Sequence, residues 1–476
     1  MRLAQGIPFR VWWLVAAGWL IAGHSTRVAA AQASAAPTGQ APVTLTLDSA
    51  IALALRVATP VQQGRFAAAN AGTEVTRSYA GLLPSVGGTA GRAVTTGNPL
   101  VGSRAMAPWD TRFETMGYQL STSLNLLGGL MAYPGIRAAQ YTKQAYGLTL
   151  ARTEQSVALD VSQAYLQAVL DSQLVTLATQ NVDVSRQRVG QLSELVRLGK
   201  RPPADLYRAQ AQQSADESAV FDADNRLLSD QIALLQRIHI DPQETVVLVP
   251  PQLDTTLLGP AYRDTAALVS EALRQRLDLR SAQTEIDATR WGIRRASNED
   301  LPSLAIGFGL FSTGRVFDRA TQSGVNQVTL SQPSLADQVG EQATTVFSVG
   351  VGYNLFDLFR SRLDRQEAQV AYGSAQLAAG DVRREVAGDV SQAVGEYGVA
   401  VNRLGSTAVG LSAAQAAFDL VSGRFEVGFS SIVELLTAQA ALFQAQNLRA
   451  QAIVQLGLAK RAVAYSIGLQ PTDQLP

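Results

Sequence analysis

Residue types that carry much of protein chemistry are absent or rare in this chain. It has no cysteine and only two histidines, His24 and His239, and 16% of its residues are charged, with a formal net charge of zero. The lack of cysteine excludes disulfides, thiolate metal sites, cysteine nucleophiles and lipidation on an N-terminal cysteine. So little histidine leaves no basis for a Ser-His-Asp triad or a histidine-rich metal site. We therefore expect no catalytic site, cofactor or metal, and the balanced charge gives no indication of a nucleic-acid partner.

Long hydrophobic runs are also missing, apart from one near the N-terminus. Residues 11–22 form an apolar run that is too short to span a bilayer but is typical of a secretory signal peptide. Arg2 and Arg10 supply positive charge before or at its start, and the small residues at 29–31 fit a cleavage site. We predict a signal peptide over residues 1–31; the alternative is an N-terminal membrane anchor.

A short strand joined directly to a very long helix is the most distinctive pattern in the chain. Between Tyr118 and Leu126 apolar and polar residues alternate, as in a strand with one apolar face. The spacing then becomes helical from about residue 131 to 198, which at ~1.5 Å per residue makes a helix of about 100 Å. Globular helices usually have about 10–14 residues. A turn and a return helix over about 204–238 follow, with His239 expected as a structural cap.

The same pattern occurs twice at a constant offset. Adding 229 takes Gly199 to Gly428, and it takes the Val-Ser-Gln-Ala sequence at 161–164 to the one at 390–393. Self-similarity of this kind indicates one supersecondary unit that has been duplicated. The predicted division is a signal peptide (1–31), a first repeat (32–240), an equatorial connector (241–265), a second repeat (266–468) and a C-terminal tail (469–476).

Each repeat also contains a shorter helix and two strands. The helices are expected over about 47–82, with Asp48 or Ser49 as the N-cap, and over about 266–300. Besides the strand at 118–126, the alternation predicts strands that include about 85–95, 304–310 and 347–355, and each strand is expected to have about 9–11 residues. The polar stretches 96–117 and 312–345 are expected to be long loops.

Strands of about 9–11 residues are long enough to cross a bilayer when tilted. One strand alone would favour an ordinary sheet on a soluble core. Four such strands behind a signal peptide, with short connections on the helical side and long polar loops on the other, favour a transmembrane barrel. Four strands cannot close a barrel, and open edges are not tolerated in lipid, so we expect the barrel to be shared between chains, with 8 strands in a dimer and 12 in a trimer. The alanine-rich helices are expected to pair as a coiled-coil barrel.

Several sequence features together resemble the TolC-like outer membrane efflux proteins. These are the signal peptide, the duplication, the Leu-Pro-Ser sequences at 83–85 and 301–303, and the Asn-Leu-Phe-Asp sequence at 354–357. The resemblance covers nearly the whole mature chain. It implies a homotrimer with a 12-stranded β-barrel in the outer-membrane lipid of a Gram-negative-type bacterium, continued by an α-helical periplasmic tunnel. It also implies two partners, a periplasmic adaptor (membrane fusion) protein and an inner-membrane pump.

The resemblance places an adaptor-contacting region at the two helix turns. Its expected residues are Arg197, Leu198, Gly199, Glu426, Val427 and Gly428. Glycine at these positions allows a left-handed backbone and close approach, although plain helix C-caps explain both glycines as well.

The resemblance also places the tunnel entrance, at Asp205 and Glu434. Glu434 matches the first of two aspartates that narrow the entrance in the best-known member, and the second matches Thr437. The alternative for Glu434 is an acid that stabilises a helix N-terminus. The tyrosine and arginine that hold that entrance shut correspond to Phe425 and Ser430, so the same latch is not expected.

These observations predict a passive outer-membrane exit duct of a tripartite efflux or secretion system. An uptake porin is the first alternative, but it would have most of its mass in strands. A secreted coiled-coil structural protein is the second, but it would not need four alternating strands. The sequence shows no catalytic nucleophile, metal cluster or phosphate-binding loop, so it gives no indication of an enzyme. The sequence does not identify the cargo.

Overall fold

The structure is a computed structural model. It describes residues 43–97, 109–126, 128–242, 244, 246–259, 262, 264–298, 300–322 and 333–470. The predicted signal peptide at 1–31 lies outside the described residues. The chain divides into two units, 1–43 and 44–476, and only Val43 of the first is described.

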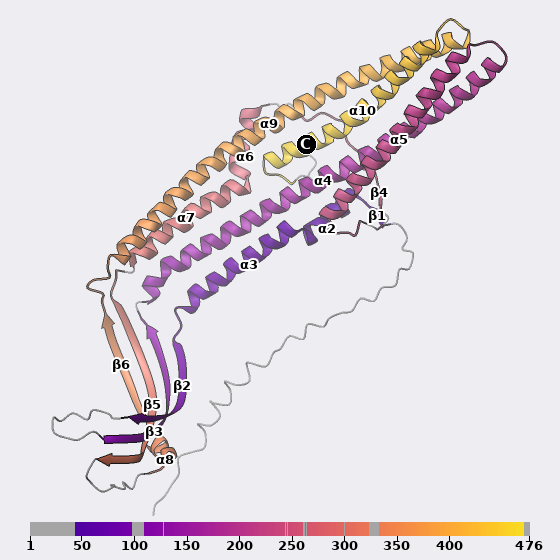
Figure 1. The fold of residues 1–476 in the computed structure, drawn as a ribbon. Coiled ribbons are helices and arrows are strands. Elements are labelled where there is room, and N and C mark those ends of the chain that lie inside the picture. The colour runs from indigo at the N-terminus through magenta and orange to yellow at the C-terminus, as the bar shows by residue number, and fades with distance from the viewer. Residues whose placement is uncertain are drawn as a thin grey trace, which may run out of the picture. The chain divides into compact units, whose positions relative to one another are not determined.

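Both halves of the described chain have the same order of elements: two shorter helices, two strands, a long helix and a return helix (Figure 1). The first half contains β1 (Val43–Leu45), α2 (Leu47–Val57), α3 (Thr59–Ala80), β2 (Ser85–Gly97), β3 (Trp109–Asn125), α4 (Gly128–Arg197) and α5 (Pro203–Arg237). The second contains β4 (Val246–Leu248), α6 (Thr265–Gln275), α7 (Leu277–Asn298), β5 (Ser303–Gln322), α8 (Leu335–Glu341), β6 (Thr344–Gly352), α9 (Arg360–Glu426) and α10 (Ile432–Ser466). The duplication itself, and the division built on it, remain predictions.

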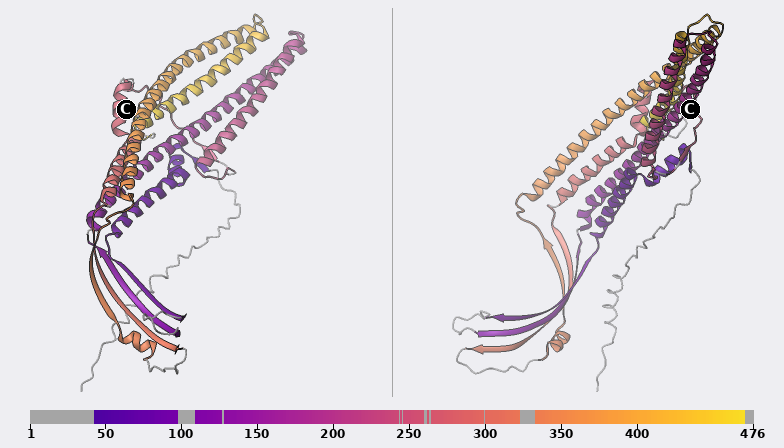
Figure 2. Two further views of the ribbon diagram at one scale, coloured as in Figure 1. Left: turned by 60° about the vertical axis from the view of Figure 1, so that its left-hand side comes forward. Right: turned by 45° about the vertical axis from the view of Figure 1, so that its right-hand side comes forward.

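The two longest helices have 70 residues in α4 and 67 in α9, and each is followed by a return helix of 35 residues. In all views α4 lies beside α3 and α5, and α9 lies beside α7 and α10 (Figures 1 and 2). Contacts of α4 with α7 and α10 join the two halves. Within the described residues, no helix is both long enough and apolar enough to cross a membrane.

Four antiparallel strands form one sheet in the order β2-β3-β5-β6. The pairing of β3 with β5 joins the two halves, with Leu120 opposite Leu310 and Leu124 opposite Ile306. Because partners across the ladder point to the same side, the predicted alternation collects these side chains on one apolar face. The outer edges of β2 and β6 have no strand partner among the described residues.

Three strands are longer than predicted. β2 has 13 residues, β3 has 17 and β5 has 20, whereas β6 has 9 and fits the expected length. The predicted loops at 96–117 and 312–345 are therefore partly wrong, because β3 and β5 extend into them. Alternation weakens in these extensions, but backbone pairing between β3 and β5 continues to Trp109 and Gln322.

The second of these loops also contains a helix, α8, which packs against β5 and β3. Its Gln338 accepts a hydrogen bond from the Arg315 backbone N–H at 2.9 Å, and Ser312 donates to the Val339 carbonyl at 2.7 Å. Gly314 makes this approach possible, because a Cβ there would lie 2.9 Å from the carbonyl oxygen of Leu335.

The two helices predicted at 47–82 and 266–300 are each broken into two. The first break is at Ala58, and Pro60 then occupies the first turn of α3. Proline lacks an N–H and its ring clashes with the preceding turn, so it is tolerated only near a helix start. The N-cap of α2 is Thr46, not Asp48 or Ser49, although Ser49 completes the capping box.

The second break has no proline and lies at Arg276, whose ψ is 127°. Its side chain is 3% exposed and forms ion pairs with Asp278 and, at 2.7 Å, with Asp389 on α9. Gly468 follows α10 with φ 93°, and a Cβ there would lie 3.2 Å from Arg276 backbone atoms. Contacts with distant parts of the chain therefore hold this break.

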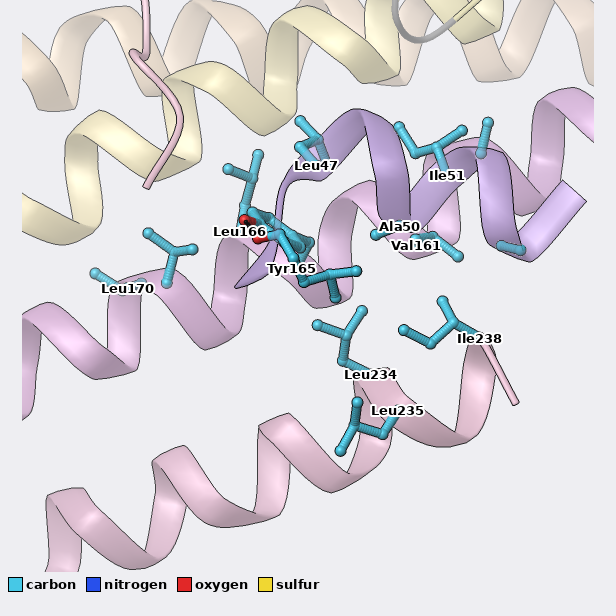
Figure 3. Close-up of a cluster of buried hydrophobic side chains, with 14 of the residues drawn as sticks. Leu47, Ala50, Ile51, Val161, Tyr165, Leu166, Leu170, Leu234, Leu235 and Ile238 are labelled. Atoms are coloured by element: carbon cyan, nitrogen blue, oxygen red, sulfur yellow. Dashed lines mark hydrogen bonds between the residues drawn. The ribbon is translucent and has the colours of Figure 1, made fainter. Parts of the chain in front are cut away.

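A hydrophobic cluster fixes α2 and α5 onto the middle of α4 (Figure 3). Tyr165 of α4 is at its centre, with no exposed surface. Its hydroxyl lies 2.7 Å from the carbonyl oxygens of both Leu45 and Val249. Burial raises the pKa of the Tyr165 phenol, which keeps it a hydrogen-bond donor. The hydroxyl thereby links the long helix to β1 and to the residue that follows β4.

We expect Tyr165→Phe to lower the free energy of unfolding by about 1–3 kcal/mol, because the buried Leu45 carbonyl and the partly buried Val249 carbonyl lose their shared donor. Thermal unfolding of the detergent-solubilised protein measures the effect. Tyr207→Phe is the matched control, because Tyr207 is 68% exposed on α5. Equal melting temperatures for Tyr165→Phe and wild type would contradict the role given to this hydroxyl.

Candidate functional site

The candidate site is formed by the two turns that end α4 and α9. Gly199 and Gly428 follow these helices with φ 67° and 86°. At the first turn the Gly199 N–H donates to Val196 and the Lys200 N–H to Leu195; at the second, Gly428 donates to Phe425 and Phe429 to Arg424. Both turns are complete Schellman motifs, so the C-cap explanation accounts for the two glycines.

The side chains around the glycines are exposed. Leu198 is 56% exposed and Val427 68%, and a Cβ on either glycine would meet no atom within 4 Å. Phe429, which the sequence interpretation did not select, is 78% exposed. Arg197 pairs with Glu194, one turn earlier, at 2.6 Å. The turns thus present apolar side chains and accessible backbone to the surroundings.

Just inside the turns, a hydrophobic cluster joins the α4–α5 hairpin to the α9–α10 hairpin. Its buried members are Leu192, Ala209, Phe425, Ile432 and Leu435. Phe425, which the resemblance matches to the latch tyrosine of the best-known member, is 5% exposed and therefore serves as a core residue. Ser430, which the resemblance matches to the latch arginine, is also 5% exposed, and its hydroxyl has no hydrogen-bond partner among the described residues.

Two arginines from the first hairpin surround Phe425, and we name Arg188, Arg201 and Phe425 the arginine clasp. The guanidinium carbon of Arg201 lies 4.4 Å from the ring centroid and that of Arg188 lies 5.6 Å away. Arg201 also donates to the Phe425 carbonyl at 3.1 Å. Burial lowers the pKa of Arg188, and the charge of Glu426 only partly offsets this. Contacts of this kind are strongest where water is excluded.

A buried polar network lies next along the helices. Gln439 of α10 donates to Asn181 at 3.0 Å and to Ser185 at 3.3 Å, both on α4. Ser185 in turn donates to Asp216 of α5, which also accepts from Gln212 at 2.9 Å. Since buried polar groups are costly when unpaired, this network fixes the register of the two hairpins.

The predicted entrance residues lie in equivalent places, each in the first turn of its return helix. Glu434 is exposed and forms a capping box with Ser431, accepting from its N–H at 3.3 Å. Asp205 is half-buried, and its closest charged partner is Arg208 at 4.0 Å. No hydrogen bond or ion pair joins Asp205 to Glu434 in the described part of the chain. Thr437 donates to the Val433 carbonyl at 2.8 Å and adds no charge.

Farther from the turns, a cavity of about 220 Å³ lies between α4, α5 and α10. Asp171 lines it and is 4% exposed. Burial, and then the side chain and charge of the neighbouring Asp230, raise the pKa of Asp171 to about 6; Gln167 and Arg226 act in the opposite direction. Of the residues that the structure describes, no three acidic or histidine side chains converge so as to hold a metal ion.

Solved outer-membrane channels have this combination of a small antiparallel sheet and long helical hairpins. The CmeC outer membrane channel of Campylobacter jejuni matches with a TM-score of 0.74 and 14% identity, over 90% of this chain and 87% of that chain. The open state of the MtrE outer membrane channel of Neisseria gonorrhoeae matches with a TM-score of 0.68 and 15% identity, over 90% of each chain. The fold is therefore that of outer-membrane channels.

The chain belongs to the outer membrane efflux protein family, whose model matches residues 50–238 and 268–469. Outer membrane protein TolC of Vibrio cholerae is 23% identical over 376 residues, covering 78% of this chain and 79% of that protein. Protein CyaE of Bordetella pertussis is 24% identical over 448 residues, covering 91% of this chain and 86% of that protein. The expected family and outer-membrane location are thus confirmed.

The raised pKa of Asp171 predicts a specific pH dependence of stability. The folded protein retains a proton that the unfolded chain releases near pH 3.8, so this site's stabilisation is present below that pH and is lost as the pH rises through about 6. We expect the loss to be about 1–3 kcal/mol in wild type and absent in Asp171→Asn.

Melting temperatures at pH 5 and pH 7.5 measure this difference. Asp183→Asn is the matched control, because Asp183 is an exposed aspartate on α4 paired with Arg186. The same pH dependence in Asp171→Asn and wild type would contradict the assignment.

Proposed function

We propose that three copies of this chain form a passive exit duct that conducts substrates from the periplasm across the outer membrane. The main supporting observation is the sheet with two open edges, whose strands lead directly into helices of 70 and 67 residues. A membrane segment and a long helical conduit then form one continuous wall. An uptake porin is less well supported, since most of the described chain is helical.

The exposed turns support docking to a periplasmic adaptor that connects the duct to an inner-membrane pump. Leu198, Val427 and Phe429 are apolar and exposed beside glycines whose backbone is accessible. A helical hairpin of a partner can pack against such a surface because no side chain keeps it away. Partners supply energy and choose the cargo, so the duct itself needs no catalytic group.

The arginine clasp is proposed to hold the two hairpins together at the closed entrance. In this proposal it takes the place of the latch of the best-known member, whose tyrosine and arginine correspond here to Phe425 and Ser430. The ring of Phe425 comes from α9, whereas both arginines come from the α4–α5 hairpin, so separating the hairpins breaks every contact of the clasp. Exposing the buried ring opposes that separation.

We propose further that Glu434 residues from three copies form an acidic ring at the entrance. Glu434 is exposed, and its capping role uses only one hydrogen bond to the Ser431 N–H, so its negative charge remains available to passing ions. A ring of like charges in a narrow opening attracts cations and repels anions. Asp205 contributes less, because it is half-buried beside Arg208.

Arg201→Gln is expected to loosen the entrance, because it removes a cation–π contact and a hydrogen bond to the Phe425 carbonyl. A loss of about 1–2 kcal/mol would raise the open fraction roughly five- to thirtyfold. Single-channel recording in planar bilayers measures the open fraction. Arg197→Gln is the control, since Arg197 is exposed at the same turn and, within the described part of the chain, pairs with Glu194 alone. If Arg197→Gln opened the channel as much as Arg201→Gln, the proposed role of the arginine clasp in closing the entrance would be contradicted.

Glu434→Gln separates charge from capping, because glutamine can still complete the capping box. We expect wild type to form cation-selective channels in planar bilayers and Glu434→Gln to shift the reversal potential toward that of an unselective pore. Glu396→Gln, an exposed acid on α9 far from the turn, serves as the control. An absence of channels in wild type would contradict the duct, whereas channels with an unchanged reversal potential in Glu434→Gln would contradict only the acidic ring.

A further inference from the structure

The turn between β6 and α9 exposes an unusual amount of apolar surface. Leu355 is 91% exposed, Phe356 68%, Leu358 76% and Phe359 60%. Phe356 and Phe359 pack edge to face, with centroids 5.7 Å apart, so they form one patch. Apolar residues gathered in this way usually mark a surface that another molecule or a membrane covers.

The backbone holds these side chains in a conformation that bulky residues rarely adopt. Leu358 and Phe359 have φ values of 59° and 65°, in the left-handed region. The Asp357 carboxylate fixes the turn by accepting from the Ser361 N–H at 2.9 Å. Glycine would fit the same backbone without strain. Leucine and phenylalanine at these positions therefore indicate that their exposed side chains are needed.

Two arginines follow immediately, at the start of α9. Arg360 and Arg362 are exposed, and neither forms an ion pair in the described part of the chain. The first turn of α9 contains no acidic residue. Cations are unfavourable at a helix N-terminus, where the backbone N–H groups already attract anions. The helix start already holds the Asp357 carboxylate, so it is the two exposed arginines that favour a negatively charged group beside the apolar patch.

The patch directly follows β6, a strand whose apolar face carries large exposed side chains. Along β6 the same face carries Phe347, Val349 and Val351, which are 61–74% exposed. The other three strand–helix junctions each expose a leucine: Leu83 (69%), Leu126 (47%) and Leu301 (50%). Of these four junctions in the described part of the chain, only the β6–α9 junction adds two phenylalanines and two unpaired arginines. In the proposed duct, this junction lies where the strands leave the hydrocarbon and meet the headgroups.

We propose that the β6–α9 turn is a binding site for anionic phospholipids of the leaflet that faces the periplasm. Leu355, Phe356, Leu358 and Phe359 insert among the upper acyl chains, and Arg360 and Arg362 bind the phosphate oxygens. Guanidinium groups suit this task because they form paired hydrogen bonds with phosphate. The proposal rests on the proposed duct, because the strands must cross the outer membrane for the turn to reach that leaflet. A second copy of the chain is the competing occupant, and the accessibility of the turn to lipid distinguishes the two.

The absence of cysteine allows a site-specific test. Phe356→Cys in the full-length protein takes a single bimane fluorophore, and the labelled protein is reconstituted into phosphatidylcholine bilayers. Bimane quenching is then compared for phosphatidylglycerol and phosphatidylcholine, each brominated near the top of the acyl chain. Leu358→Cys provides a second label position in case the first perturbs the turn.

We expect both lipids to quench the fluorophore, with phosphatidylglycerol severalfold more effective, since each arginine near an anionic surface contributes at most about fivefold. Arg360→Gln/Arg362→Gln should keep the quenching but lose the preference. Arg383→Gln/Arg384→Gln, an exposed pair on the same helix, should keep both.

Three results would overturn the site: a label shielded from both lipids, no preference in the parent protein, or an equal loss in the control pair. A label shielded from lipid would assign the turn to a second copy instead. Conductance of the same samples distinguishes failure of the duct from failure of the lipid site, because the quenching needs only a chain inserted in a bilayer.

Discussion

Pairing of backbone amides and carbonyls in a medium without water is the constraint on which the rest of this structure depends. Hydrocarbon offers no hydrogen-bond partner, so a membrane sheet must leave no open edge. The sheet of this chain has the order β2-β3-β5-β6 and leaves the outer edges of β2 and β6 without a strand among the described residues. Assembly with further copies is the proposed solution, because it pairs β6 of one copy with β2 of the next.

The helices also have sides that lack a packing partner within one chain. Within one chain α5 packs mainly on α4, and α9 packs on α10 and α7. The remaining sides stay open: Phe221 of α5 is 73% exposed, and Val399 and Val409 of α9 are 65% and 69% exposed. The proposed closure of the strands brings these flanks together as well. One symmetry would therefore complete both the membrane sheet and the helical wall.

The sequence predicted the elements whose signal is local and repeated. Helical spacing over 131–198 matches α4 (Gly128–Arg197) within a few residues. A hydrophobic period sustained over about seventy residues distinguishes a helix clearly from a strand. The turns at Gly199 and Gly428 were also found, since glycine is favoured in a left-handed C-cap. The break at Ala58 was missed although Pro60 marks it in the sequence.

Features that depend on distant contacts could not be predicted in this way. Arg276 ends a helix while paired with the nearby Asp278 and with Asp389, 113 positions later, and the second contact cannot be read from the local sequence. β5 extends beyond its alternating segment because β3 is beside it. The arginine clasp joins two hairpins, so its members are far apart in sequence. The roles of Asp205, Glu434 and the six turn residues remain predictions, because the geometry fits them without testing them.

The mass of the protein particle in mild detergent tests the account most directly. Light scattering that separates protein from detergent gives the number of chains in each particle. The account predicts three chains, since three copies supply the 12 strands that enclose a conduit. A folded particle containing one chain would contradict it, because the edges of β2 and β6 would then remain open.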